Sequence, residues 1–229
     1  MNTAEASAGI GHGPRTLVMI SGGGTNLQAI INETLAGELP INLFAVVSDR
    51  PGVLGLDRAE KAGIPTHVVD YRAIGERESA ERELASTLEE LDPQLIVLAG
   101  FMRILPTPVV EAYAGRMLNI HPSLLPRYRG LDTYRRALEA GDEWHGTTVH
   151  FVIPELDAGP PIIQYRVRIH ADETETSLQS RVQQGEYLIY PRAVGWFGEG
   201  RLRLKDGEVW LDGLPLEEPV VVNEASPGT

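Results

Sequence analysis

The chain has 229 residues, 42% of them hydrophobic, with a formal net charge of −12 and a pI of about 4.9. This length and hydrophobic content suffice for a buried core in one large α/β domain or two small ones. The acidic balance argues against the broad basic surface that a tRNA or DNA partner requires, although backbone amides at a helix start can still bind one phosphate. Because the chain has no cysteine, disulfides, thiolate catalysis and thiolate zinc sites are excluded.

The two ends of the chain differ in composition from the rest. The first fourteen residues lack the basic start and apolar stretch of a secretion signal, and no apolar run reaches the roughly 18 residues of a membrane span. We therefore expect a cytoplasmic protein without a membrane partner. Residues 1–14 are expected to be a disordered extension and residues 213–229 a loose tail. A single domain is expected over residues 15–212, because no repeat or linker interrupts them.

Short apolar runs alternate with helical patterns along the first half of the chain. Apolar residues on successive positions are typical of strands buried on both faces, and such runs cover residues 16–21, 41–48, 66–69, 95–100 and 116–120. The clearest helical pattern between them covers residues 76–91, whose apolar side chains recur on one face at Ala80, Leu84, Leu88 and Leu91. This alternation predicts an α/β fold with an open, mostly parallel twisted sheet and helices on both faces.

The second half of the chain continues with two strand patterns and a long helical one. Residues 147–153 and 161–169 favour strands, and a helical pattern runs from about residue 176 to residue 196. The dipeptide Asp206-Gly207 separates two short strand patterns within residues 201–211. An Asp-Gly pair in this position predicts a small C-terminal hairpin.

A glycine-rich turn joins the first buried strand pattern to a helix that is expected to begin near Asn26. Glycines at residues 22–24 let the backbone approach a ligand, and the free amides of the helix start favour a phosphate. The stretch could equally be a tight strand-to-helix connection, since it lacks the lysine of a P-loop and the third glycine of the dinucleotide fingerprint. Asp49 ends the next strand pattern, about where that fingerprint places a ribose-binding acid, so a nicotinamide site stays open.

Two polar side chains end the strand pattern at residues 116–121. Residues two apart on a strand point to the same side, so Asn119 and His121 should project together while Leu118 and Ile120 pack the other face. An asparagine amide and a histidine N–H can both donate to an oxygen that gains negative charge, and the histidine can also serve as general acid. The pair therefore predicts an oxyanion site, unless the two residues merely cap the strand end.

A second polar loop follows the strand pattern that contains His150. The strand breaks at Pro154 into a loop with Asp157, an aspartate that could accept a proton through water, although an aspartate close to a glycine is often a turn former. His145 and His150 are five apart and would face opposite sides of a strand. Since no HExxH or similar spacing occurs, we expect no metal site.

Taken together, these motifs identify a resemblance. The segments SGGGTNLQAI, LAGFMRILP, LNIHPSLLP, HGTTVHFVIPELDAGP and RVQQGEY, in this order, resemble the glycinamide ribonucleotide formyltransferases, the folate-dependent enzymes of purine synthesis. The resemblance spans roughly residues 16 to 212 and implies a Rossmann-like formyltransferase fold. NIHPSLLP and ELDAGP are shared by the wider group that uses 10-formyltetrahydrofolate. The acceptor is therefore implied by the amino-terminal turn, the RVQQGE segment and the length.

The resemblance also implies roles for residues and 10-formyltetrahydrofolate as co-substrate, with no metal. Asn119 and His121 would stabilise the oxyanion as the glycinamide amine attacks, and Asp157 would assist His121 and the proton transfer. The ribonucleotide would be bound by Gly24, Thr25 and Asn26, and by Gln183, Gln184, Gly185 and Glu186. The folate would contact Arg77, Met102, Arg103, Ile104 and Leu105, as well as Asn119, Ile153, Pro154, Glu155, Leu156 and Asp157.

Some positions depart from the family pattern, and three alternative functions stay open: two related folate-dependent enzymes and one binding module of another class. Arg129-Gly130, Asp132, Tyr187 and Pro161 stand where many members have other residues, and an arginine-glycine pair also occurs in methionyl-tRNA formyltransferases. A methionyl-tRNA formyltransferase needs a further nucleic-acid-binding domain and a basic surface. A formyltetrahydrofolate hydrolase needs an added amino-terminal domain. A non-catalytic nucleotide-binding module would not need the polar trio. Small-molecule substrates and a monomer or weak homodimer are expected.

Overall fold

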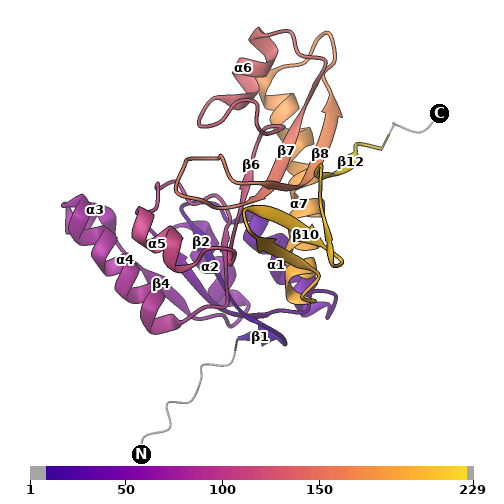
Figure 1. Ribbon diagram of the computed structural model, residues 1–229. Helices are drawn as coiled ribbons and strands as arrows, with labels where there is room; N and C mark the ends of the chain where they lie inside the picture. The colour runs from indigo at the N-terminus through magenta and orange to yellow at the C-terminus, as the bar shows by residue number, and fades with distance from the viewer. Residues whose placement is uncertain (1–8, 226–229) are drawn as a thin grey trace, which may run out of the picture. The chain divides into compact units, whose positions relative to one another are not determined.

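The computed structural model describes residues 9–225, and these form two compact units that meet in sequence at Met117 and Leu118. The colour bar of Figure 1 gives the residue numbers along the chain. No helix within the described residues is long and apolar enough to cross a lipid bilayer. The single domain predicted for residues 15–212 stays a prediction.

The first unit is built on a mostly parallel sheet in the strand order β1-β3-β2-β5, with β4 also paired to β3. Its strands are β1 (Ile10–Gly11), β2 (Arg15–Ile20), β3 (Asn42–Ser48), β4 (Thr66–Val68) and β5 (Leu95–Leu98). Only β1 runs antiparallel to its neighbour among the pairs described in this unit. Residues 17–20, 43–47 and 95–98 are buried throughout, as the continuous apolar runs predict for strands covered on both faces.

Helices connect these strands and supply the remaining core of the first unit. They are α1 (Thr25–Leu35), α2 (Leu54–Lys61), α3 (Tyr71–Ile74), α4 (Arg77–Leu91) and α5 (Thr107–Ala112). The predicted face of α4 is confirmed at Ala80, Leu84 and Leu88, which are fully buried, whereas Leu91 at the end of the helix is only partly buried. Parallel strands bring their carboxyl ends to one edge, so the loops after β2, β3 and β5 share that edge.

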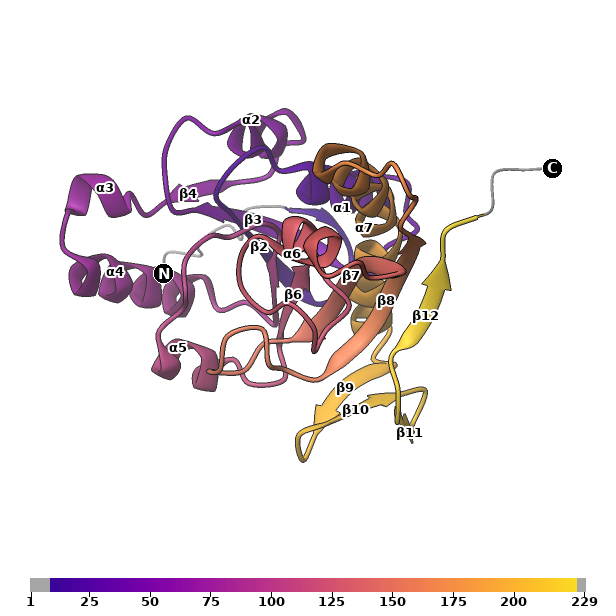
Figure 2. The same cartoon turned by 90° about the horizontal axis from the view of Figure 1, so that it is seen from above.

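The second unit is a mixed sheet with one long helix against it. β6 (Met117–His121), β7 (Trp144–Phe151) and β8 (Pro161–Arg168) run antiparallel in that order. β12 (Val220–Asn223) pairs in parallel with β8, as Figure 2 shows. α7 (Glu175–Gly198) contacts β7, β8 and α6 (Thr133–Glu139). The predicted α/β class and mostly parallel sheet are confirmed, with the antiparallel β6-β7-β8 segment as an addition.

A small antiparallel sheet follows α7, and it confirms the predicted hairpin. β9 (Leu202–Lys205) and β10 (Glu208–Leu211) are joined at Asp206-Gly207, and β11 (Leu214–Pro215) adds a third strand. Both turn residues have positive φ, which explains the Asp-Gly sequence. Figure 2 shows the three strands together beside the end of α7.

The predicted loose ends are wrong for the residues that form β1, β11 and β12. Ile10 pairs with Leu43, and Val220 pairs with Ile163. Both segments lie at an edge of the sheet, where a short strand gains backbone hydrogen bonds from a strand distant in sequence. A local composition rich in glycine, proline or acids does not reveal such long-range pairing. Residues 1–8 and 226–229 of the two predicted ends lie outside the described residues.

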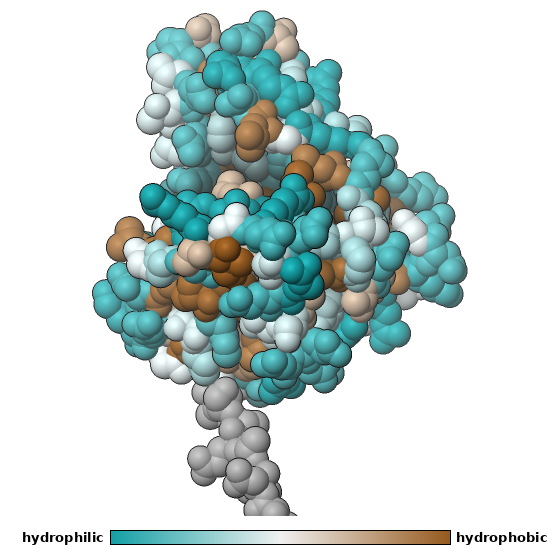
Figure 3. Space-filling view, turned by 90° about the vertical axis from the view of Figure 1, so that its left-hand side faces the viewer, coloured by the Kyte–Doolittle hydropathy of each residue, from teal (hydrophilic) through white to brown (hydrophobic). Residues whose placement is uncertain are grey.

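The face of the molecule shown in Figure 3 is largely polar. In the face shown in Figure 3, teal hydrophilic side chains dominate and brown hydrophobic ones gather in small patches. Among the described residues, large hydrophobic side chains more than half exposed include Met102, Ile104 and Leu131. All three lie in loops, so they are available for ligand contacts.

Candidate active site

Asn119 and His121 lie on one face at the carboxyl end of β6. The alternation of β6 is as predicted: Leu118 is fully buried and Ile120 is 8% exposed on the other face. Across the antiparallel pair, Asn119 lies opposite His150 and His121 opposite Thr148. Two strands therefore present four polar side chains on one side of the sheet.

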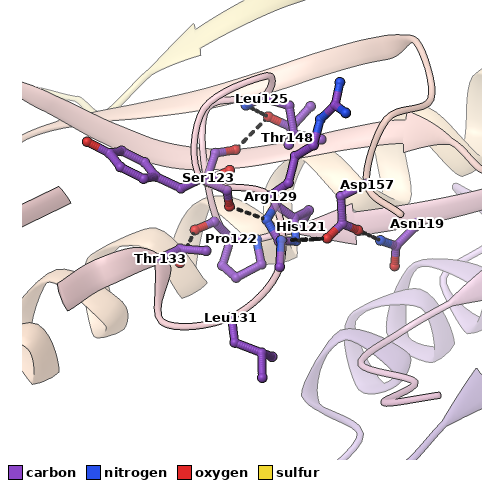
Figure 4. Close-up of polar contacts among 12 residues, drawn as sticks. Asn119, His121, Pro122, Ser123, Leu125, Arg129, Leu131, Thr133, Thr148 and Asp157 are labelled. Carbon is purple, nitrogen blue, oxygen red and sulfur yellow. Dashed lines mark hydrogen bonds and ion pairs between the residues drawn. The ribbon is translucent and has the colours of Figure 1, made fainter. Parts of the chain in front are cut away.

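Asp157 lies between these two residues, as Figure 4 shows. It comes from the loop between β7 and β8, and its Oδ2 is 3.4 Å from His121 Nδ1. Its Oδ1 accepts a long hydrogen bond of 3.5 Å from Asn119 Nδ2, and Oδ2 accepts one of 3.0 Å from the backbone N–H of Gly130. The side chains of His121 and Asp157 are only 7% and 9% exposed, so little water screens the charge of the aspartate.

His150 completes the cluster, and sequence reasoning assigned it no role. Its Nδ1 lies 2.8 Å from the carbonyl oxygen of Phe151, which can only accept, so Nδ1 carries the proton. A neutral ring then has its acceptor at Nε2, which lies 3.1 Å from Asn119 Nδ2. Burial lowers the pKa of His150 to about 4, although the Phe151 carbonyl and Asp157 oppose this shift. The neutral ring therefore fixes which way the Asn119 amide points.

Both ring nitrogens of His121 face oxygen acceptors. Nε2 lies 2.9 Å from the carbonyl oxygen of Tyr128, while Nδ1 faces Asp157. A ring protonated at both nitrogens can donate to both oxygens. Tyr128 and Asp157 each have a positive φ, 55° and 48°, which is uncommon for residues other than glycine and often marks functional sites. The loop between β6 and α6 thus reaches back to the end of β6.

The departures at Arg129-Gly130 lie in this same loop. Gly130 has a φ of 79°, and its N–H is the donor to Asp157. Arg129 Nη1 donates to Glu155 Oε1 at 2.6 Å, and Glu155 belongs to the same loop as Asp157. The pair joins two loops that carry partners of His121.

The predicted phosphate turn of the first unit has the expected local geometry. Gly24 is the N-cap of α1 with φ 68°, and a Cβ there would lie 2.6 Å from the Cα of Gly55. The turn therefore needs glycine at this position, whereas a Cβ on Gly22 or Gly23 would meet nothing within 4 Å. No side chain caps α1, and no acidic residue stands in its first turn. Its first N–H groups favour an anion.

The predicted folate residues of the first unit lie mainly in the loop after β5. Met102 is 65% exposed, Ile104 is 56% exposed and Leu105 is buried. Arg103 donates to Asp49 at 2.7 Å, which explains an arginine within an apolar stretch. Because the Asp49 side chain is fully buried and paired, it does not offer a carboxylate to a nucleotide ribose. Arg77, at the start of α4, is mostly exposed and pairs with Glu81.

The remaining predicted ligand residues belong to the second unit. On α7, Gln184 is exposed while Glu186 is 7% exposed. Gly185 has a packing reason of its own, because a Cβ there would overlap the ring of Tyr165. In the loop after β7, Pro154, Glu155 and Leu156 are exposed. Within residues 9–225 no group of three or more histidine, aspartate or glutamate side chains is arranged to hold a metal ion.

Comparisons with known proteins agree with the predicted family. A model of the formyl transferase family matches residues 14–194. A phosphoribosylglycinamide formyltransferase from Escherichia coli is 49% identical over 200 residues, which is 87% of this chain and 94% of the relative. One from Haemophilus influenzae is 44% identical over 207 residues, or 90% and 98% of the two chains.

A solved structure gives the same assignment. The structure of the phosphoribosylglycinamide formyltransferase from Coxiella burnetii superposes with a TM-score of 0.85 at 48% sequence identity. The superposition covers 90% of this chain and 97% of the other. The chain therefore belongs to the formyl transferase family, among its phosphoribosylglycinamide formyltransferases.

Proposed function

We propose that this chain transfers the formyl group of 10-formyltetrahydrofolate to the amine of N1-(5-phosphoribosyl)glycinamide, a step of de novo purine synthesis. The family assignment supports the reaction class and the substrates. The observation that carries the chemistry is the cluster of Asn119, His121, His150 and Asp157 at the end of β6. The cluster combines the neutral amide donor of Asn119, the His121 ring between two oxygen acceptors, and the nearly buried carboxylate of Asp157.

In the proposed reaction, the glycinamide nitrogen attacks the formyl carbon and a new C–N bond forms. The carbonyl electron pair moves to the formyl oxygen, which becomes an oxyanion. One amide N–H of Asn119 is directed at His150. The second N–H has only the long 3.5 Å contact to Asp157, so it can donate to the oxyanion. Preorganised donors of this kind stabilise charge that develops in the transition state.

His121 supplies the second donor in this proposal. Its Nε2 faces the Tyr128 carbonyl in the structure, so it must exchange this contact for the formyl oxygen when substrate binds. Asp157 Oδ2 faces the other ring nitrogen at 3.4 Å and holds the ring in place. Asp157 also directs, through water, the proton that leaves the attacking amine and reaches the N10 nitrogen of the folate. The electron pair of the oxyanion then re-forms the carbonyl as the bond from the formyl carbon to N10 breaks, giving tetrahydrofolate and the formylated ribonucleotide.

The ligand contacts proposed for each unit follow the predicted sets. In the first unit, the α1 turn at Gly24, Thr25 and Asn26 binds the phosphate, and the exposed Met102 and Ile104 contact the folate. In the second unit, residues 153–157 contact the folate, and Gln183 and Glu186 bind the ribonucleotide. A cytoplasmic location, a monomer or weak homodimer and a reaction without metal stay predictions.

The test of the proposal is turnover by Asn119→Ala and His121→Ala. Loss of one oxyanion donor typically lowers turnover by roughly 10²- to 10³-fold, and we expect each variant to fold and still bind a folate analogue. His67→Ala, which changes a histidine of β4, is the matched control and should retain turnover. Near-normal turnover in Asn119→Ala or His121→Ala would remove that residue from the mechanism.

A further inference from the structure

Asp49 is a buried carboxylate for which the proposed reaction gives no role. It follows β3 directly, and its side chain is fully buried. Burial by itself raises the pKa of Asp49, but hydrogen bonds from Ser21, Arg103 and Arg50 outweigh it and lower the pKa below its usual value. Burying a carboxylate costs free energy unless it is paired and hydrogen-bonded, and these three partners offset that cost.

The partners of Asp49 are Arg103 from the loop after β5, Ser21 directly after β2, and its own neighbour Arg50. Arg103 Nε donates to Asp49 Oδ2 at 2.7 Å, the shortest of the arginine contacts. Arg50 donates from Nε to Oδ1 at 3.3 Å and from Nη2 to Oδ2 at 3.4 Å. Ser21 hydrogen-bonds to Asp49 and also accepts the backbone N–H of Met102 at 2.8 Å. Two consecutive loop residues, Met102 and Arg103, are thus held by one carboxylate and its serine.

This arrangement fixes a backbone while leaving its apolar side chains exposed. Met102 and Ile104 are 65% and 56% exposed, whereas Leu105 is buried at 8% and anchors the other end of the segment. The Arg103 guanidinium also lies over the ring of Tyr71, 4.8 Å from its centre. Exposed apolar side chains do not stabilise a loop in the free protein. The conformation of this loop therefore depends on the hydrogen bonds to Asp49 and Ser21.

We infer that Asp49 and Ser21 are positioning residues that hold the segment Met102–Leu105 in the conformation that binds the folate co-substrate. The inference rests on the proposed function, because it takes Met102 and Ile104 as folate contacts. Preorganisation of this kind lowers the ordering cost of binding, so its loss should weaken folate binding rather than the chemical step.

The experiment compares Asp49→Ala and Ser21→Ala with the parent chain in steady-state kinetics. A hydrogen bond to a charged group corresponds to a change of roughly tenfold or more in an equilibrium constant. We therefore expect the KM for 10-formyltetrahydrofolate and the Kd for a folate analogue to rise about tenfold, while kcat and the KM for the ribonucleotide stay within about twofold. Asp49→Asn keeps an oxygen acceptor for Arg103 and should recover most of the affinity.

Two further measurements separate positioning from a merely structural role. Glu60→Ala removes an exposed carboxylate of α2 in the same unit and should change neither constant. Hydrogen exchange at the Met102 amide should be faster in Ser21→Ala, a milder change that keeps the Asp49 pairs. Folate constants that stay unchanged in both Ser21→Ala and Asp49→Ala, or a fall of kcat in these variants without a change of the folate KM, would overturn the inference.

The activity of the parent chain distinguishes a failure of this inference from a failure of the proposed function. If the parent transfers no formyl group, the proposed function fails, and the folate-analogue Kd still decides whether Ser21 and Asp49 position the loop. If the parent transfers the formyl group and the variants bind the folate analogue as it does, the inference alone fails.

Discussion

Acid should destabilise this protein through two buried histidines of β7. His145 and His150 are 1% and 2% exposed, and burial lowers the pKa of each to about 4. In the unfolded chain a histidine titrates near its ordinary pKa of about 6.5. Between these two values the unfolded state binds more protons than the folded state. Stability is therefore fully present above about pH 6.5 and is lost as the pH falls toward 4.

The size of the effect follows from the two pKa values. Lowering the pH from 7.5 to 5.0 should reduce the free energy of unfolding by about 2 kcal/mol for each histidine. The assay is urea unfolding at both pH values, for the parent and for His150→Gln. We expect the acid-induced loss in His150→Gln to be smaller by about 2 kcal/mol, whatever its stability at pH 7.5. His67→Gln is the control and should show the full loss. An equal loss in His150→Gln and the parent would refute a neutral, buried His150.

Three further predictions concern single residues of the loops. Asp157→Asn should lower kcat by roughly 10²-fold or more, because general acid-base groups contribute this much, while folate-analogue binding is retained; unchanged kcat would make Asp157 a turn former. Gly24→Ala should cost about 1–2 kcal/mol of stability for a left-handed residue and raise the KM for the ribonucleotide, whereas Gly23→Ala should be nearly neutral in thermal unfolding. Arg129→Ala should lower the free energy of unfolding by no more than about 1 kcal/mol, since its ion pair with Glu155 is exposed. A larger loss in urea unfolding would show that the pair stabilises the loop that carries Asp157.

Much of the fold could be predicted because its strands are continuous apolar runs. Residues 41–48 and 95–100 contain β3 and β5 in full, and the long helical pattern at 176–196 lies within α7. The edge strand β12 was missed, since its three valines stand among prolines and acids and are ordered only by pairing with β8. Pairing with a distant strand is a tertiary effect that local composition does not contain.

The candidate site was predictable to the extent that it depends on local geometry. The two-residue period of a strand placed Asn119 and His121 together, and the structure confirms their shared face. The role of His150 was missed because it depends on the pairing register of β6 and β7, which the sequence does not state. Asp49 and Arg103 are 54 positions apart, and only the meeting of the β3 and β5 loops brings them into contact.

The most direct test of the proposed function is formyl loss from 10-formyltetrahydrofolate, followed by ultraviolet absorbance with and without glycinamide ribonucleotide. The proposed direct transfer predicts loss that requires the ribonucleotide, with one formylated ribonucleotide formed for each tetrahydrofolate released. Equal loss without the ribonucleotide would show a hydrolase, and no loss under either condition would contradict formyl transfer by this chain.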